Sequence, residues 1–212
     1  MLRSLFYLLL VKPLVLVILG INARDKQHLP EHGPAIIVAN HNSHLDVLAL
    51  MSLFSLKTIA NVHPVAAADY FCKNRWLNWF AVNVIGIIPI ERKAPVGQDV
   101  LAPVLAALDR QAILILFPEG TRGEPESMSK LKNGIGHILN ERPNIAVIPV
   151  FFYGLGKSLP KGEIILIPFF IDAFIGEPMH WAGDRKAFMT DLSTNLAELQ
   201  KKASRQSANH FE

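Results

Sequence analysis

Cysteine is almost absent from this sequence, and charged residues are few. The 212 residues include one cysteine, Cys72, which excludes an internal disulfide, and its apolar neighbours are typical of an inert buried thiol. Lysine and arginine number 21 and aspartate and glutamate 18, so the formal net charge is +3. So small a basic excess suits a phosphate-bearing ligand or an anionic membrane surface better than nucleic acid.

The start of the chain also lacks an uninterrupted apolar segment of bilayer length. Residues 1–21 are rich in leucine and valine, but Lys12 and Pro13 divide them. A lysine at the centre of a membrane helix costs roughly 2.5–3.5 kcal/mol, so we expect two short helices, joined by a bend, within one leaflet, with Lys12 reaching the headgroups. The expected location is the cytoplasmic face of the inner membrane. A bent spanning helix is an alternative, and so is a signal peptide, although no clear cleavage site precedes Arg24.

After residue 30, short apolar runs alternate with longer amphipathic segments. Strands are predicted at residues 35–39, 62–66, 85–90, 112–117, 145–152 and 164–169, and helices at 45–54, 70–82, 98–110, 131–140 and 184–204. This alternation indicates a single α/β layered domain with a central, largely parallel or mixed sheet flanked by helices. We expect residues 1–24 to form the membrane-associated helical segment, 25–204 the domain and 205–212 a polar tail.

The first predicted strand, residues 35–39, leads into Asn40-His41-Asn42-Ser43-His44-Leu45-Asp46. Ligands of open α/β sheets bind at the carboxyl ends of strands, so His41 is a candidate general base. His41 and Asp46 are five residues apart and would diverge on a regular helix. If the chain turns at Ser43, Asp46 can accept the imidazole N–H and fix its tautomer.

Two other interpretations of this segment stay open. Ser43-x-x-Asp46 before an apolar run is also a capping box, in which Asp46 would bond backbone N–H groups and His41 would be an ordinary loop residue. A metal site formed by His41, His44 and Asp46 is a weaker alternative, because no second cluster of ligands follows downstream.

Two later clusters of basic residues also follow predicted strands. Arg92 ends the run that begins at Gly86, and its guanidinium could bind a phosphate with two N–H groups, although arginines at strand ends are common. The strand at 112–117 leads into Pro118-Glu119-Gly120-Thr121-Arg122, and Lys130 and Lys132 follow. Backbone amides, a hydroxyl and cations would converge there as a phosphate site. The alternative is a plain turn in which Glu119 pairs with Arg122.

Four segments together resemble the glycerolipid acyltransferases, the family of lysophosphatidic acid (1-acylglycerol-3-phosphate) acyltransferases. They are Asn40-His41-x-Ser43-x-x-Asp46, Gly86-x-x-Pro89-Ile90-x-Arg92, Phe117-Pro118-Glu119-Gly120-Thr121-Arg122 and Val147-Ile148-Pro149-Val150, in the family's order. One departure is Pro89, where the family usually has an aromatic or aliphatic residue.

The resemblance implies a role for each matched residue. His41 would be the general base and Asp46 its orienting partner. The phosphate of the acceptor would lie against Arg92, Glu119, Gly120, Thr121 and Arg122, with Lys132 nearby. The family also implies an apolar groove for the acyl chain and a bent N-terminal helix pair embedded in the leaflet.

The reaction expected from the resemblance moves a fatty acyl group from acyl-CoA or acyl carrier protein to the hydroxyl of a lysophospholipid. The most favoured acceptor is 1-acylglycerol-3-phosphate, which would give phosphatidic acid. No metal or prosthetic group is expected, since the thioester is already activated. The motifs leave open glycerol-3-phosphate, another lysophospholipid or a lyso-aminolipid as the acceptor, and a thioesterase or lipid hydrolase in which His41 activates water. A non-enzymatic lipid-binding protein would keep the anion site and tolerate the loss of His41.

Overall fold

Short apolar runs separated by turns build the central sheet of this protein. The structure, a computed structural model, describes residues 2–71, 74–91, 99–158 and 170–208. Its strands are β1 (Ile21–Arg24), β2 (Ala35–Ala39), β3 (Val62–Ala67), β4 (Ile88–Ile90), β5 (Ile113–Leu116), β6 (Ala146–Tyr153) and β7 (Ile171–Ile175). Every residue of β2 is buried, as expected for a strand covered on both faces.

The described α-helices flank the sheet or lie at its ends. They are α1 (Leu2–Phe6), α2 (Asp46–Ser52), α3 (Ala68–Phe71), α4 (Arg75–Phe80), α5 (Ala102–Asp109), α6 (Gly134–Glu141), α7 (Leu155–Ser158) and α8 (Arg185–Ala208). The π-helical segments are Tyr7–Val11, Pro13–Ile18 and Ala81–Ile85, and short 3₁₀ turns lie at Lys26–His28 and Ile59–Asn61.

The seven strands of the described residues form one mixed sheet in the order β1-β7-β6-β2-β5-β3-β4. β2 lies between β5 and β6 and runs parallel to both, while β3 pairs in parallel with β5 and β4. β7 is antiparallel to β6, and β1 pairs in parallel with β7. This arrangement confirms the predicted α/β domain with a central sheet, and it brings the carboxyl ends of β2, β5 and β6 to one edge.

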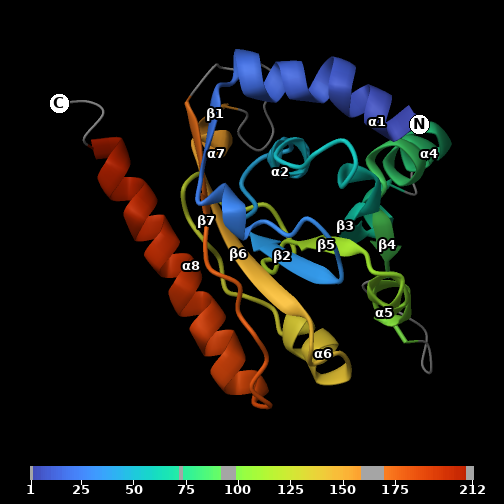
Figure 1. Ribbon diagram of the computed structural model, residues 1–212, viewed down its shortest axis with the longest axis vertical. Coiled ribbons are helices and arrows are strands. Elements are labelled where there is room, and N and C mark those ends of the chain that lie inside the picture. The colour runs from blue at the N-terminus through green and yellow to red at the C-terminus, as the bar shows by residue number, and fades with distance from the viewer. Residues whose placement is uncertain (1, 72–73, 92–98, 159–169, 209–212) are drawn as a thin grey trace.

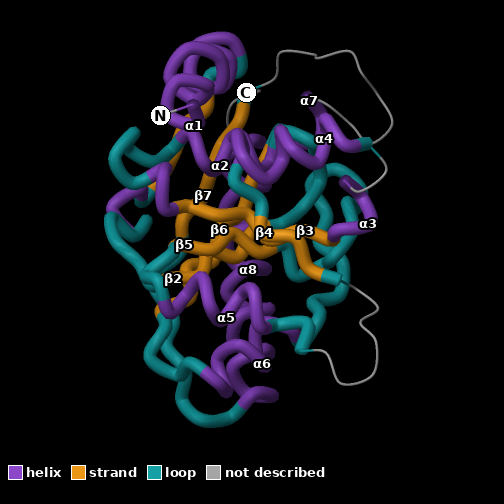
Figure 2. Tube along the Cα trace, turned by 90° about the vertical axis from the view of Figure 1, so that its right-hand side faces the viewer, coloured by secondary structure: helices purple, strands orange, loops and turns teal. Residues whose placement is uncertain are grey.

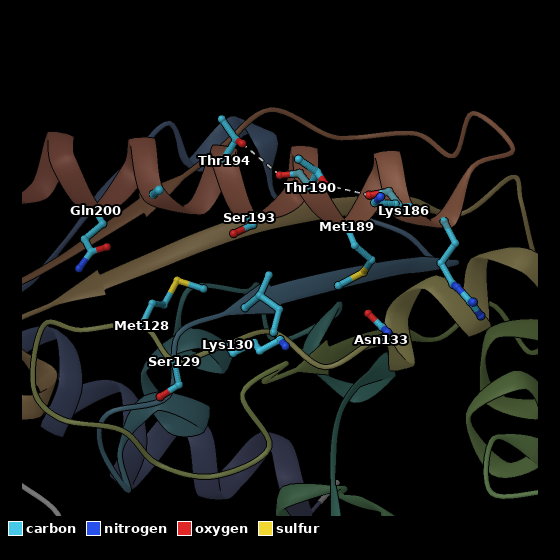
Figure 3. Close-up of a pocket in the computed structure, with 13 residues that line it drawn as sticks. Met128, Ser129, Lys130, Asn133, Lys186, Met189, Thr190, Ser193, Thr194 and Gln200 are labelled. Carbon is cyan, nitrogen blue, oxygen red and sulfur yellow. Dashed lines mark hydrogen bonds between the residues drawn. The ribbon is translucent and has the colours of Figure 1, made fainter.

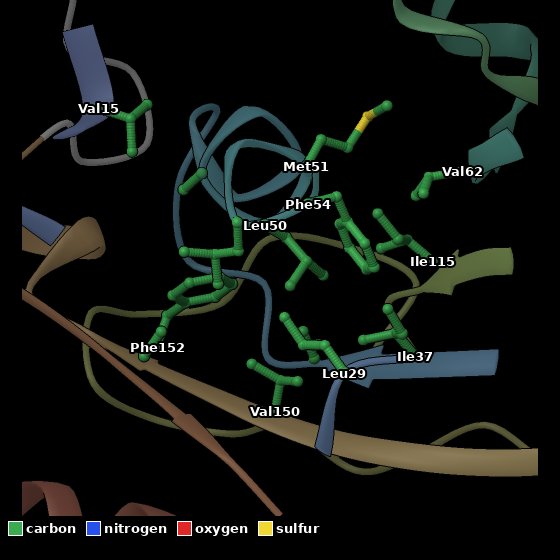
Figure 4. Close-up of a cluster of buried hydrophobic side chains, with 14 of the residues drawn as sticks. Val15, Leu29, Ile37, Leu50, Met51, Phe54, Val62, Ile115, Val150 and Phe152 are labelled. Atoms are coloured by element: carbon green, nitrogen blue, oxygen red, sulfur yellow. The ribbon is translucent and has the colours of Figure 1, made fainter. Parts of the chain in front are cut away.

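Alternate residues of the strands pack into different cores on the two faces of the sheet. Ile37 of β2 faces a core that includes the N-terminal helix and α2, whereas Ile36 faces a core formed with α5, α6 and α8. Figures 1 and 2 show these helix layers on opposite sides of the strands. Figure 4 shows the first core, where Leu50 and Phe54 lie over strand residues such as Ile37 and Val150.

The N-terminal segment differs from the expected pair of short helices. Helical backbone continues through Lys12, with φ −63° and ψ −45°, so no break separates two helices there. Lys12 Nζ donates to the carbonyl of Phe54 at 2.9 Å rather than reaching outward, because the helix packs one face against the domain from Tyr7 to Leu19. Within the ranges that the structure describes, no helix is both long and apolar enough to cross a membrane.

The N-terminal helix has one face that is part of the domain core. Tyr7, Val11, Val15 and Leu19 are buried at intervals of four residues, a spacing that the wide π-helical turns keep on one side. Arg3 Nη1 donates to the carbonyls of Ile59, Ala60 and Val62, and the Tyr7 hydroxyl contacts Met51 Sδ at 2.9 Å. Burial lowers the pKa of Arg3 from its usual value.

Several element boundaries also differ from the sequence predictions. β1 and β7 were not predicted, because β1 has only two apolar residues in four and β7 follows an apolar run that contains Pro168. The predicted strand at 164–169 and Cys72 lie outside the described residues. The predicted helix at 70–82 is divided among α3, α4 and a π-helical segment, and the Asn74 side chain caps α4 by accepting from Trp76 N and Leu77 N. α8 continues to Ala208, past its predicted end.

Candidate active site

The loops that leave β2, β5 and β6 are joined to one another by side chains. Asn40, directly after β2, forms a pair of bonds with Phe152 of β6: its Nδ2 donates to Phe152 O at 3.0 Å and its Oδ1 accepts from Phe152 N at 2.7 Å. On the other side, the Glu119 carboxylate after β5 accepts from His41 N at 2.9 Å. His41 is therefore held between the ends of both neighbouring strands.

The side chain of His41 lies against Asp46 and Phe117. His41 Nδ1 is 2.8 Å from Asp46 Oδ2, and the imidazole stacks on the Phe117 ring with 4.3 Å between the ring centres. About 22% of the His41 side chain is exposed, whereas Asp46 is almost completely buried. No hydrogen bond from the described part of the chain reaches His41 Nε2, so this nitrogen is available to a substrate.

Asp46 both caps the start of α2 and contacts the imidazole. Its Oδ2 accepts from the backbone N–H groups of Asn42, at 2.8 Å, and Ser43, at 2.9 Å, as well as facing His41 Nδ1. The two interpretations of this motif therefore do not exclude each other. A carboxylate oxygen that accepts from two backbone N–H groups can only accept from His41 as well, so the neutral imidazole has its proton on Nδ1 and a lone pair on Nε2.

Glu119 is buried and both of its oxygens accept from backbone. Oε1 accepts from His41 N, and Oε2 accepts from Ser129 N at 2.8 Å. These backbone bonds take the place of the alternative ion pair between Glu119 and Arg122. A further bond, from Gly123 N to His41 O at 2.8 Å, joins the same two loops. The backbone of His41 is thus fixed at its N–H and its carbonyl by the loop that follows β5.

Two cationic side chains, Arg122 and Lys132, lie at the turn that follows β5. The Arg122 guanidinium contacts His44 Nε2 and lies 5.9 Å from the centre of the Tyr70 ring. Burial, and after it the charge of Arg122, lowers the pKa of His44, which favours its uncharged form at neutral pH. Gly120 has φ +71°, and a Cβ at this position would clash with Lys132 Nζ, so the lysine side chain crosses directly over this glycine.

The other predicted site residues lie either on the loop that follows β5 or outside the described residues. Thr121 is exposed between Gly120 and Arg122, and Lys130 is exposed at the start of the segment that leads to α6. Arg92 lies outside the described residues. Across the residues that the structure does describe, no three histidine, cysteine or acidic side chains are grouped so that they could hold a metal ion.

Two functional candidates were missed because they depend on contacts distant in sequence. Asn42 Nδ2 donates to the carbonyls of Glu124 and Ser127, which ties the His41 loop to residues 124–127. Glu126 accepts from Gly154 N at 2.9 Å through Oε1, and burial raises its pKa. No local pattern in the sequence distinguishes either residue from an ordinary loop residue.

Comparison with known proteins assigns this arrangement to a family. The profile of the family described as Acyltransferase matches residues 20–153, the part of the chain that contains β2, β5, β6 and the His41 loop. The chain belongs to the acyltransferase family. This confirms the family resemblance of the four motifs, all of which lie within the matched range.

Relatives within this family cover most of this acyltransferase domain. The chloroplastic 1-acyl-sn-glycerol-3-phosphate acyltransferase LPAT1 of Arabidopsis thaliana is 32% identical over 168 residues, which is 76% of this chain and 44% of that protein. The 1-acyl-sn-glycerol-3-phosphate acyltransferase alpha of Mus musculus is 31% identical over 163 residues, 74% of this chain and 53% of the mouse protein. This chain thus spans about half the length of these curated relatives.

A solved structure shares the fold. The crystal structure of the 1-acyl-sn-glycerophosphate (LPA) acyltransferase PlsC from Thermotoga maritima superposes with a TM-score of 0.70 and covers 85% of this chain and 71% of that one. At 19% sequence identity, this likeness supports the layered fold of the acyltransferase domain.

Proposed function

We propose that this acyltransferase transfers a fatty acyl group from an acyl thioester to the hydroxyl of 1-acylglycerol-3-phosphate, which gives phosphatidic acid. The observation that carries the proposal is the His41–Asp46 pair, with 2.8 Å between Nδ1 and Oδ2 and with Nε2 open to a substrate. A serine nucleophile is not needed, since the acceptor hydroxyl itself can be deprotonated by the imidazole. The names of the relatives support the choice of acceptor.

The proposed chemistry is a single acyl transfer with His41 as base and then acid. His41 Nε2 takes the proton of the acceptor hydroxyl while that oxygen attacks the thioester carbonyl, and Asp46 stabilises the imidazolium that forms. The tetrahedral intermediate then releases the thiolate, which takes the proton from Nε2. An ester bond replaces the thioester bond, and neither a metal nor a redox step is required.

The acceptor's phosphate is proposed to bind the cationic groups around Gly120. Arg122 belongs to this turn and Lys132 crosses over Gly120, and charge-assisted bonds to phosphate are among the strongest hydrogen bonds in proteins. Arg92 is proposed as a further ligand on the strength of its motif. Glu119, whose oxygens accept from two backbone groups, would hold the loop in position rather than contact the phosphate itself.

The replacement Arg122→Ala should raise the KM for lysophosphatidic acid by about 10-fold to 100-fold, the value of one charge-assisted hydrogen bond. The matched control is Arg110→Ala, an exposed arginine that precedes β5 and so lies at the opposite end of that strand. Steady-state rates at varied acceptor concentration in mixed micelles provide the measurement. An unchanged KM would mean that the phosphate binds elsewhere.

The protein is proposed to associate with a membrane through the outer face of its N-terminal helix. Leu9 and Val17 are 65% and 78% exposed, on a helix whose other face is buried in the domain. The Phe6 and Phe80 rings meet edge to face, which brings α4 beside this helix, and α4 carries the exposed Trp76 and Trp79. Exposed leucine and tryptophan side chains on adjoining helices are typical of a surface that enters the headgroup region.

The double substitution Leu9→Glu/Val17→Glu should weaken binding to anionic vesicles by about tenfold or more, because two large apolar side chains no longer enter the bilayer. Co-sedimentation with vesicles measures the effect. Lys201→Glu makes the same total change in charge on α8, which packs against the opposite face of the sheet, and it should bind nearly as well as the unmodified protein. An equal loss of vesicle binding in both variants would indicate that charge alone attracts the protein to the membrane.

Product analysis tests the proposed reaction itself. Purified protein in mixed micelles would receive acyl-CoA or acyl carrier protein donors with a panel of lysolipids, and mass spectrometry would identify the products. Phosphatidic acid formed from lysophosphatidic acid is the expected result. A different diacyl product would show that another lysolipid is the acceptor. Free fatty acid formed without any acceptor would show that water is the nucleophile.

A further inference from the structure

A groove lies on the face of the sheet that carries α8, between this helix and the later part of the loop that follows β5. It has a volume of about 730 Å³ and runs between residues 128–133 and the first four turns of α8. Figure 3 shows side chains from both walls pointing into it, among them Met128 and Lys130 from the loop and Met189 and Ser193 from the helix. We call this the α8 groove.

All of the charged residues that line the α8 groove are basic. Lys130 lies on one wall and Arg185 and Lys186 on the other, and none of the described residues that line it is acidic. Asp184, the residue directly before Arg185, accepts from Ala187 N at 2.9 Å and so caps the helix. The positive end of the α8 dipole adds to the three cations. The remaining lining residues are hydroxyls, amides, thioethers and a few aliphatic groups, so the groove suits an anionic ligand with polar and flat apolar parts.

The wall of this groove is connected to the candidate active site through one carboxylate. Ser129, which lines the groove, donates its N–H to Glu119 Oε2, and Glu119 Oε1 accepts from His41 N. Lys132, three residues after Ser129, crosses over Gly120 beside the same loop. A ligand in the groove can thus lie next to the loop that carries the base.

The two faces of the domain differ in the kind of molecule that they suit. The N-terminal helix exposes large apolar side chains on one face of the sheet, while the α8 groove lies on the other face. A lysolipid would reach His41 from the apolar side. The acyl donor has a polar, phosphorylated carrier that stays in water, so it fits the cationic side.

We propose that the α8 groove binds the phosphorylated nucleotide part of coenzyme A, with the acyl thioester directed toward His41. This inference rests on the proposed function and adds a location for the donor. A groove of about 730 Å³ is within the range of small-molecule sites, which is about 300–1,000 Å³. Lys130, Arg185 and Lys186 bind the phosphates, and the methionine side chains contact the adenine ring.

The test compares two pairs of substitutions on the same helix in the whole 212-residue chain. Arg185→Gln/Lys186→Gln removes two positive charges from the groove, and the control Lys201→Gln/Lys202→Gln removes two from exposed positions outside it. Titration calorimetry with free coenzyme A measures binding without turnover, and steady-state rates with long-chain acyl-CoA give KM and kcat. The groove pair should raise the Kd for coenzyme A and the KM for acyl-CoA at least about tenfold. The kcat and the KM for lysophosphatidic acid should stay within about twofold, and the control pair should resemble the unmodified protein.

Three results would overturn the proposal: no change in the Kd of coenzyme A with the groove pair, equal weakening by both pairs, or an unmodified protein that uses only acyl carrier protein and does not bind coenzyme A. Lys130→Gln, on the opposite wall, provides the same test if the α8 pair lowers the melting temperature. Failure of the proposed function has a different signature, because coenzyme A would then bind through these cations although no phosphatidic acid is formed.

Discussion

Replacing His41 by alanine should lower kcat for phosphatidic acid formation by about 10²-fold to 10⁴-fold, the usual contribution of a positioned general base. The acceptor's KM should change little, because the cationic groups around Gly120 remain. The fold should also remain, since the loop is fixed by backbone bonds at His41 N and His41 O that do not involve the imidazole. Initial rates at saturating donor and acceptor, together with a thermal melting curve, measure both effects.

The control for this replacement is His32→Ala. His32 is an exposed histidine that precedes β2, so it lies at the opposite end of the strand that carries His41. Its loss should leave kcat unchanged within about twofold. A folded His41→Ala protein with nearly full activity would exclude the imidazole as the base and would leave the anion site as the main function of this edge of the sheet.

The sequence predicted β2, β5 and β6, the strands that position the site, but it did not predict β1 and β7. β2, β5 and β6 are runs of mostly buried apolar residues with both faces covered, and such runs are recognisable without any knowledge of their neighbours. β1 is short and partly exposed at the edge of the sheet, and its pairing with β7, about 150 residues later, leaves no local pattern. β1 and β7, at one end of the sheet, therefore could not be read from periodicity, whereas β4, at the other end, lies within a predicted strand.

The same distinction applies to the candidate site. Spacing alone predicted that His41 and Asp46 could meet if the chain bends at Ser43, and the structure has that contact. The bonds that hold the loop join residues 78 and 112 positions apart, from His41 to Glu119 and from Asn40 to Phe152. Such pairs follow from the order of strands in the sheet, which the sequence pattern does not determine.

The N-terminal helix was harder to interpret, because it is apolar on all sides. A helix of this kind is either buried or faces lipid, and here Tyr7 and Val15 are buried while Leu9 and Val17 are exposed. Composition indicated the apolar character but not which face packs on the domain. Deleting the whole segment would therefore expose the core along with removing the proposed membrane contact, which is why single-face substitutions are the better test.

Replacing Asp46 by asparagine should reduce kcat by about 10²-fold or more, with a smaller effect on the fold. The N–H groups of Asn42 and Ser43 should keep the amide oxygen where Oδ2 now lies, so the start of α2 remains capped and His41 keeps its tautomer. What is lost is the negative charge that stabilises the imidazolium. Asp46 Oδ1 is buried with no partner among the described residues, so an amide nitrogen there would also lack an acceptor, at a cost of about 1–3 kcal/mol in unfolding free energy.

A double-mutant cycle separates this positioning role from a purely structural one. If Asp46 acts through His41, adding Asp46→Asn to His41→Ala should lower kcat by less than about threefold, although the same change in the unmodified protein lowers it about 10²-fold. A cap alone would give a different result: Asp46→Asn would lower the melting temperature, but kcat per folded molecule would not change even in the protein that retains His41. Because Asp46 Oδ2 accepts from both the imidazole and the backbone, only the dependence on His41 can show which contact the reaction needs.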